Sequence, residues 1–174
     1  PEVGSIPATE AHLKAGREIP ICLNTEPTNN EIHTKSSGTF DFRVEIEGQG
    51  IHTSQKNLLN YPQRHGIRQG SEVGVDATGI LVQIIEQFDD LEHQWNMRYD
   101  DEIYGGGGTP RPDVQGVGPA SITCTIVEAG DYIASIPGHA TIEGQVYWPP
   151  QAEDTALWEE MREAVTALAA TDDW

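Results

Sequence analysis

The chain has few basic residues: ten lysines and arginines stand against 28 aspartates and glutamates, giving a formal net charge of −18 over 174 residues. Only Lys14, Lys35 and Lys56 are lysines. So negative a surface repels nucleic acid and anionic membranes, and neither is expected as a partner. Solubility alone explains the acidic excess, and so does a salt-loving source in which salt screens the repulsion. Composition leaves both explanations open.

Long apolar runs and cysteine pairs are also lacking. No run reaches the roughly 18 apolar residues of a membrane span. The start, Pro1–Ser5, lacks the basic and apolar parts of a signal peptide, so a cytoplasmic location is expected, with the reservation that a fragment could have lost its leader. The two cysteines, Cys22 and Cys124, each lie in an apolar, strand-like run. They are predicted to be buried free thiols and not a disulfide.

Five segments carry a regular apolar pattern: strands at 39–48, 120–128 and 140–148, and helices at 73–96 and 154–170. The order strand, helix, strand, strand, helix predicts an α+β, ferredoxin-like (split βαβ) fold, with an antiparallel sheet and both helices on one face. Its fourth strand should follow the second helix, and we expect this chain to lack it. An early strand of the same chain is the alternative occupant of that place.

Several short motifs follow one another along the chain. They are Glu26-Pro27-Thr28, the turn Lys35–Gly38, the alternating strand Phe40–Ile46, the turn Gly48–Ser54 with His52, Gly74–Ala77, and Ala129-Gly130 followed by Ser135–Pro137. Their order resembles that of the zinc-dependent deacylases and peptidases that include acetylornithine deacetylase, succinyl-diaminopimelate desuccinylase and aminoacylase. The likeness extends over roughly residues 17–174. No single motif is strong, and the ordered set carries the resemblance.

The resemblance implies a fragment of an enzyme. Residues 1–35 would be a piece of the catalytic domain with its hinge, and residues 36–174 the lid, or dimerisation, domain. His52 would reach into the active site of the partner subunit and help to hold the oxyanion of the tetrahedral intermediate. Glu26 would be one ligand of zinc or cobalt in the full-length enzyme. No metal is expected in this chain, because one carboxylate cannot hold zinc alone.

Other residues of the family pattern are absent or altered. No histidine is followed by Asp two residues later, so the family's His-x-Asp ligand motif is missing. Glu159-Glu160 lies in a helix after the strands and is interpreted as solvated surface. Ala134 stands where many members have Asn, and Tyr147 where many have a substrate-binding Arg, which removes a bidentate carboxylate partner. Arg98 and Arg111 are candidate replacements by charge alone.

The sequence therefore predicts the lid of a metal-dependent amidohydrolase that forms a homodimer and cleaves N-acyl amino acids or small peptides. The alternative is a stand-alone ferredoxin-like module that binds a small molecule or self-associates. The segment Ile19–Thr28 distinguishes the two, since it has no obvious role in an isolated module.

Overall fold

The computed structural model describes residues 5–18, 37–56, 74–101, 105–106 and 119–171. The chain divides into two compact units, Pro1–Thr34 and Lys35–Trp174. In the first unit, α1 (Ser5–Lys14) is followed by Gly16, whose φ of 67° lets the chain leave the helix. The sequence of residues 9–15 predicts a short helical turn, and the helix begins four residues earlier.

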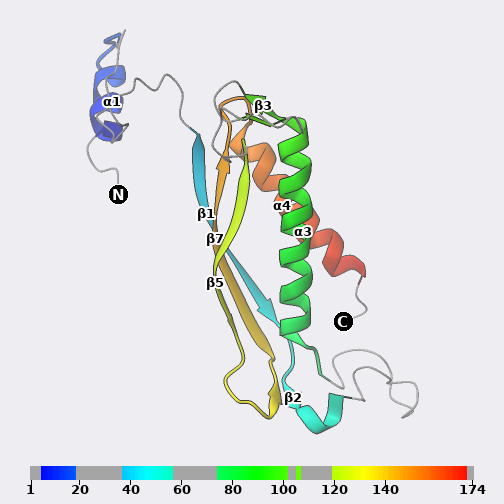
Figure 1. Cartoon of the computed structure of the whole chain (residues 1–174). Coiled ribbons are helices and arrows are strands. Elements are labelled where there is room, and N and C mark those ends of the chain that lie inside the picture. The colour runs from blue at the N-terminus through cyan, green and yellow to red at the C-terminus, as the bar shows by residue number, and fades with distance from the viewer. Residues whose placement is uncertain (1–4, 19–36, 57–73, 102–104, 107–118, 172–174) are drawn as a thin grey trace, which may run out of the picture. The chain divides into compact units, whose positions relative to one another are not determined.

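The second unit is built on three antiparallel strands in the order β1-β7-β5 (Figure 1). β1 (Gly38–Glu47) pairs with β7 (His139–Trp148) along its whole length, and β7 pairs with β5 (Ser121–Ala129). The alternation predicted for β1 is confirmed. Phe42 and Ile46 are buried, whereas Arg43 and Glu45 lie on the opposite face and form an ion pair.

β5 contains an irregularity that simple alternation does not predict. The register shifts between Cys124 and Ile126, so Ile126 lies opposite Glu143 and Val127 lies opposite the buried Ile142. Simple alternation predicts that Ile122, Cys124 and Ile126 share one face, which is wrong for Ile126. An extra residue in one strand reverses the side-chain alternation beyond it.

Two long helices, α3 (Ala77–Arg98) and α4 (Asp154–Thr171), cover one face of the sheet (Figure 1). α3 starts later than the predicted residue 73, because Asp76 is its N-cap and accepts hydrogen bonds from the amides of Thr78 and Gly79 at 3.0 and 3.3 Å. The predicted apolar stripe of α3 is confirmed. Its buried residues are Ala77, Ile80, Leu81, Ile84, Phe88, Leu91 and Trp95.

The architecture is the predicted α+β one, a small antiparallel sheet with two long helices, consistent with a ferredoxin-like fold. The described residues supply three of its four strands, and the outer edge of β1 is where the remaining strand of this topology pairs. Within the same described part of the chain, no helix is long and apolar enough to cross a membrane.

Short elements complete the second unit. β2 (Ile51–His52) pairs with β6 (Ser135–Ile136), and a 3-10 helix, η1, spans Thr53–Gln55. β3 (Asp100–Asp101) pairs with β4 (Gly105–Gly106). A run of four glycines predicts a surface loop at Gly105–Gly108. This is wrong for the two glycines of β4, and the other two lie outside the described residues.

Candidate functional site

The turn that carries His52 is fixed to the hairpin leading into β7. The amide of Gly48 donates to the carbonyl of Gly138 at 2.8 Å, and the amide of Thr53 donates to the carbonyl of Ala134 at 2.9 Å. A Cβ on Gly138 would lie 2.3 Å from the amide nitrogen of Gly50, so only glycine allows the two backbones to approach so closely. The glycines around this turn therefore bring the hairpin and the His52 segment together.

His52 is exposed, and its ring is held from one side. It is the N-cap of η1, with φ −67° and ψ 137°, and its Nδ1 accepts a hydrogen bond from the amide of Ser54 at 3.2 Å. The Oγ of Ser54 lies 2.8 Å from the same Nδ1. Among the described residues no partner is recorded for Nε2. The ring thus presents Nε2 outward, where a bound molecule can meet it.

A hollow of about 470 Å³ lies beside this turn, on the other side of β6. Gly50 and Ser135 line it together with the acidic side chains of Glu128 and Asp131, and His139 stands at its rim near Glu47, Nδ1 to Oε1 3.4 Å. His139 was predicted to be a turn residue at a strand entry, and it is the exposed first residue of β7.

The two departures from the family pattern lie in different places. Ala134 is part of the His52 site, because its carbonyl holds the Thr53 amide. Tyr147 pairs with Thr39, near the opposite end of β7 from His139. At about 3.3 Å per residue along a strand, it lies roughly 26 Å from the end that carries the His52 turn. Only the Ala134 departure can therefore alter the immediate surroundings of His52 within one copy.

Most other candidate residues are not brought to this site. Glu26 and Arg111 lie outside the described residues. Arg98 is held by Glu160 on α4, with 2.6 Å between Nη1 and Oε1, at the other end of the unit's core. Within the described ranges, no group of three or more His, Cys, Asp or Glu side chains is arranged to hold a metal ion. The described residues thus do not fit a catalytic metal.

Glu160 differs from its sequence interpretation. Its Oε2 accepts a hydrogen bond from Nε1 of the fully buried Trp95 at 2.8 Å, while Oε1 binds Arg98. Burial acts to raise the pKa of Glu160, but the hydrogen bonds from Arg98 and Trp95 outweigh it and leave the pKa below its usual value. The solvated-surface interpretation suits its neighbour Glu159, whereas Glu160 joins α4 to α3. Sequence alone gives no signal for this difference.

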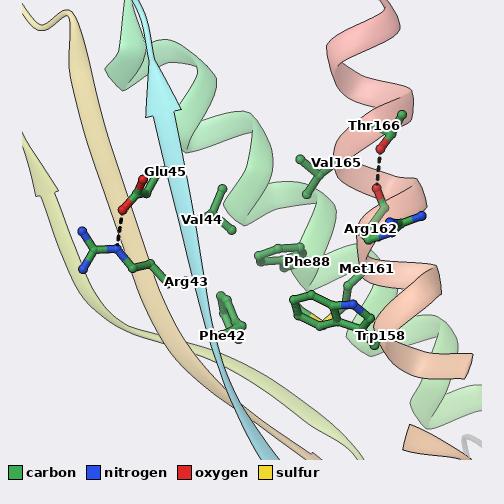
Figure 2. Close-up of a pocket in the computed structure, with 10 residues that line it drawn as sticks. All are labelled: Phe42, Arg43, Val44, Glu45, Phe88, Trp158, Met161, Arg162, Val165 and Thr166. Carbon is green, nitrogen blue, oxygen red and sulfur yellow. Dashed lines mark hydrogen bonds and ion pairs between the residues drawn. The ribbon is translucent and has the colours of Figure 1, made fainter. Parts of the chain in front are cut away.

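An apolar groove follows the outer edge of β1 (Figure 2). Its central part has a volume of about 300 Å³, with Phe42 and Val44 of β1 facing Trp158, Met161 and Val165 of α4. Two further hollows continue the groove along β1, one beyond each end of this central part. The first, of about 290 Å³, lies around Phe40 and Trp158, and the second, of about 260 Å³, lies around Ile46 and Leu168. The groove is therefore as long as β1 and largely apolar.

The other edge of the sheet, β5, is partly protected by α3. The amide of Ile122 donates to the carboxylate of Glu92 at 2.7 Å, and the side-chain amide of Asn96 exchanges hydrogen bonds with both backbone groups of Ala120. Beyond the bulge, Ile126 and Val127 are 50% and 47% exposed. Only the second half of β5 is thus available to another chain.

Cys124, predicted to be a buried free thiol, is free and half-buried on β5. Burial, with a smaller effect from the charge of Asp89, raises its pKa above the usual value. The thiol therefore stays protonated and is a poor nucleophile. Cys22 lies outside the described residues.

The sequence matches a protein-family model. A family model described as "Peptidase dimerisation domain" matches residues 34–173. No curated protein is similar enough to the chain to match it.

Several solved structures align with the chain at low identity. A Staphylococcus aureus protein described as an aminohydrolase superimposes with a TM-score of 0.52 and 13% identity, over 79% of this chain and 28% of that one. An amidohydrolase/peptidase-like protein of Burkholderia cenocepacia aligns with a TM-score of 0.47 and 17% identity, over 79% of this chain and 25% of that one. The aminopeptidase PepT of Bacillus cereus aligns with a TM-score of 0.44 and 14% identity, over 78% of this chain and 26% of that one. The chain spans about a quarter of the length of each.

Proposed function

Because the chain belongs to the peptidase dimerisation domain family, we propose that it is the lid and dimer contact of a larger metal-dependent amidohydrolase or peptidase. The observation that carries this proposal is the family match over residues 34–173, together with an exposed His52 presented on a backbone-fixed turn. A cytoplasmic location is part of this proposal.

His52 is the residue through which the lid acts on the reaction. The chain enters the sheet at Gly38, and the ten-residue β1 separates that point from the His52 turn by about 30 Å. A side chain at this far end suits delivery to the active site of a neighbouring subunit. There an imidazole N–H aimed at the developing oxyanion lowers the barrier to amide cleavage.

The homodimer forms through β5. One edge of the sheet, β1, faces the groove under α4, which leaves β5 as the edge for a second copy. The half of β5 that α3 does not cover carries Ile126 and Val127, whose apolar side chains lose water when two copies of this strand pair antiparallel. The two sheets then become one, and the α3 helices of the two copies come close to each other.

The groove along β1 is the place of the fourth strand, which follows α4 in the full-length enzyme. A strand there lies parallel to β7 with β1 between them, and β7-α4-strand is then an ordinary right-handed crossover. Alternate apolar side chains of that strand would fill the space between Phe42, Val44 and α4. The stand-alone module of the alternative proposal would instead keep the groove for a small apolar ligand.

The metal, zinc or cobalt, belongs to the remainder of the enzyme, with Glu26 as one ligand and residues 1–35 as part of the catalytic domain. When bound, it supplies the activation of the attacking water. The substrates are N-acyl amino acids or small peptides, as in the deacylase and aminoacylase branch that the motifs resemble. Tyr147 in place of Arg argues that the substrate carboxylate, where one is present, is bound elsewhere.

The test uses the full-length enzyme, screened for free-amine release from N-acyl amino acids and small peptides with added zinc or cobalt. His52→Ala is expected to lower kcat on the order of 100-fold, the usual effect of losing one oxyanion donor. His93→Ala, an exposed histidine on α3, is the matched control and should leave kcat unchanged. Unchanged turnover in His52→Ala would remove the catalytic role, and no turnover of any substrate would favour the stand-alone module.

A further inference from the structure

The contacts of the His52 ring assign a proton as well as a position. We propose that Ser54 is a positioning residue that keeps Nδ1 of His52 as a hydrogen-bond acceptor, so that the proton of the neutral ring sits on Nε2. His52 then acts as a neutral N–H donor and not as a base. The inference rests on the proposed function, because a donor has a catalytic purpose only where His52 meets a substrate.

The argument begins with the backbone amide of Ser54. An amide N–H can only donate, so the 3.2 Å contact makes Nδ1 the acceptor. The hydroxyl of Ser54, 2.8 Å from the same nitrogen, must then donate as well. A neutral imidazole carries one proton, and with Nδ1 accepting it must be on Nε2. The outward nitrogen of His52 is therefore the one that carries hydrogen.

The turn itself keeps this arrangement in place. His52 pairs with Ser135 across β2 and β6, and the next amide, that of Thr53, is bound to the carbonyl of Ala134. The backbone on both sides of the ring is thus fixed to the hairpin before Ser54 closes the 3-10 turn. A ring fixed at its backbone and at Nδ1 has little freedom left, and preorganised donors lose the least energy on binding a developing charge.

The consequence is a specific dependence on pH. An imidazole locked with hydrogen on Nε2 donates there when neutral, and it also donates there when a second proton arrives at Nδ1 and both nitrogens carry hydrogen. Without the lock, the neutral ring spends part of its time with the proton on Nδ1 and cannot donate outward. Loss of the Ser54 hydroxyl leaves only the backbone amide to hold Nδ1 and so weakens the lock, with an effect at neutral and alkaline pH and not in acid.

The charged neighbours do not provide an alternative lock. Ala134, Ser135 and Ile136, which face the His52 segment from β6, carry no titratable side chain. The titratable groups on the adjoining elements are Lys56 at the C-cap of η1 and, around the neighbouring hollow, Glu47, Glu128, Asp131 and His139. Among the described residues, only Ser54 is recorded in contact with the ring of His52.

The first test is independent of turnover. Two-bond ¹⁵N–¹H spectra of the imidazoles, recorded on this 174-residue chain at alkaline pH, should show His52 with protonated Nε2 and unprotonated Nδ1. Ser54→Ala, which removes the hydroxyl and keeps the backbone amide, should move both nitrogens part of the way toward the average of the two tautomers. Ser54→Thr should keep the wild-type positions, and Thr53→Ala, which removes the neighbouring hydroxyl, should change neither. A protonated Nδ1 in the wild type, or unchanged nitrogens in Ser54→Ala, would overturn the inference.

The second test compares kcat of Ser54→Ala and wild type in the full-length enzyme across pH. The ratio of wild-type to variant kcat should reach about twofold at alkaline pH, the loss expected when the ring shares its proton between the two nitrogens, and should fall toward one in acid as both nitrogens come to carry hydrogen. A ratio that is constant with pH, or a loss in His52→Ala with none in Ser54→Ala, overturns the role of Ser54 alone. Full activity in both variants overturns the proposed function of His52 and the role of Ser54 with it.

Discussion

The contact between α3 and α4 offers a sharp test, because two adjacent glutamates make different contacts. In Glu160→Ala the Nε1 of the buried Trp95 loses its acceptor, which costs about 1–3 kcal/mol. Arg98 also loses a partly exposed ion pair, worth about 0.5 kcal/mol. Together these lower the free energy of unfolding by about 2 kcal/mol, which corresponds to a fall of about 6 °C in Tm for a chain of this size.

The matched control is Glu159→Ala on the same helix turn. Glu159 forms only an exposed pair with Arg162, so its removal should cost under about 0.5 kcal/mol. Both variants are measured by urea unfolding and by thermal melts followed by circular dichroism. Equal loss of stability in the two variants would show that the contact between Glu160 and Trp95 contributes nothing.

The charge of Glu160 adds a dependence on pH whose sign follows from its lowered pKa. A carboxyl group with a folded pKa below its unfolded value contributes stability above the unfolded pKa, and that contribution is lost as the pH falls through the folded pKa. The difference in unfolding free energy between wild type and Glu160→Gln should therefore be largest near neutral pH and shrink below about pH 4. A difference that stays constant into acid would contradict the assigned ion pair.

Three further predictions follow from the packing, the sheet edge and the charge. Gly144→Ala places a Cβ within 2.5 Å of the Phe42 ring and should destabilise the chain by about 2–3 kcal/mol, whereas Gly79→Ala, with nothing closer than 3.7 Å, should be neutral or slightly stabilising in chemical denaturation. Ile126→Lys should weaken self-association on the order of tenfold in analytical ultracentrifugation, and Leu13→Lys, at an exposed apolar position of the first unit, should not. If the acidic excess reflects a salt-loving source, Tm should be higher in molar potassium chloride than in low salt, and equal Tm values would count against that source.

Sequence periodicity was sufficient for the elements whose side chains alternate or recur without interruption. The strand with Phe40, Phe42, Val44 and Ile46 and the stripe of α3 were predictable because each has one wet and one buried side. The bulge in β5 was not, since one extra residue leaves the apolar composition unchanged and alters only which side chain faces inward. The start of α3 was displaced for a similar reason, because Val75 fits a helical pattern but lies in a bridge to Gln49.

Some features of the candidate site were likewise predictable from the sequence, and others were not. The exposure of His52 followed from its polar, glycine-rich surroundings, and the structure agrees. The contact that fixes its ring comes from Ser54, two residues later, and the only sequence signal for it is a polar residue placed where an N-cap partner belongs. The buried role of Glu160 had no signal at all, because its partners lie more than 60 residues away in the sequence. Glu26 stays a prediction.

Glu92 of α3, which accepts a hydrogen bond from the Ile122 amide, also limits which part of β5 can pair with another strand. An uncovered strand end invites neighbours to add in several offsets, and such sliding contacts are how ordered aggregates begin. With the first half of β5 closed by α3, a second copy finds hydrogen-bonding groups only beyond the bulge, where a single offset satisfies them. If two copies pair through β5 as proposed, assembly through this strand should stop at a pair and not continue into a fibre.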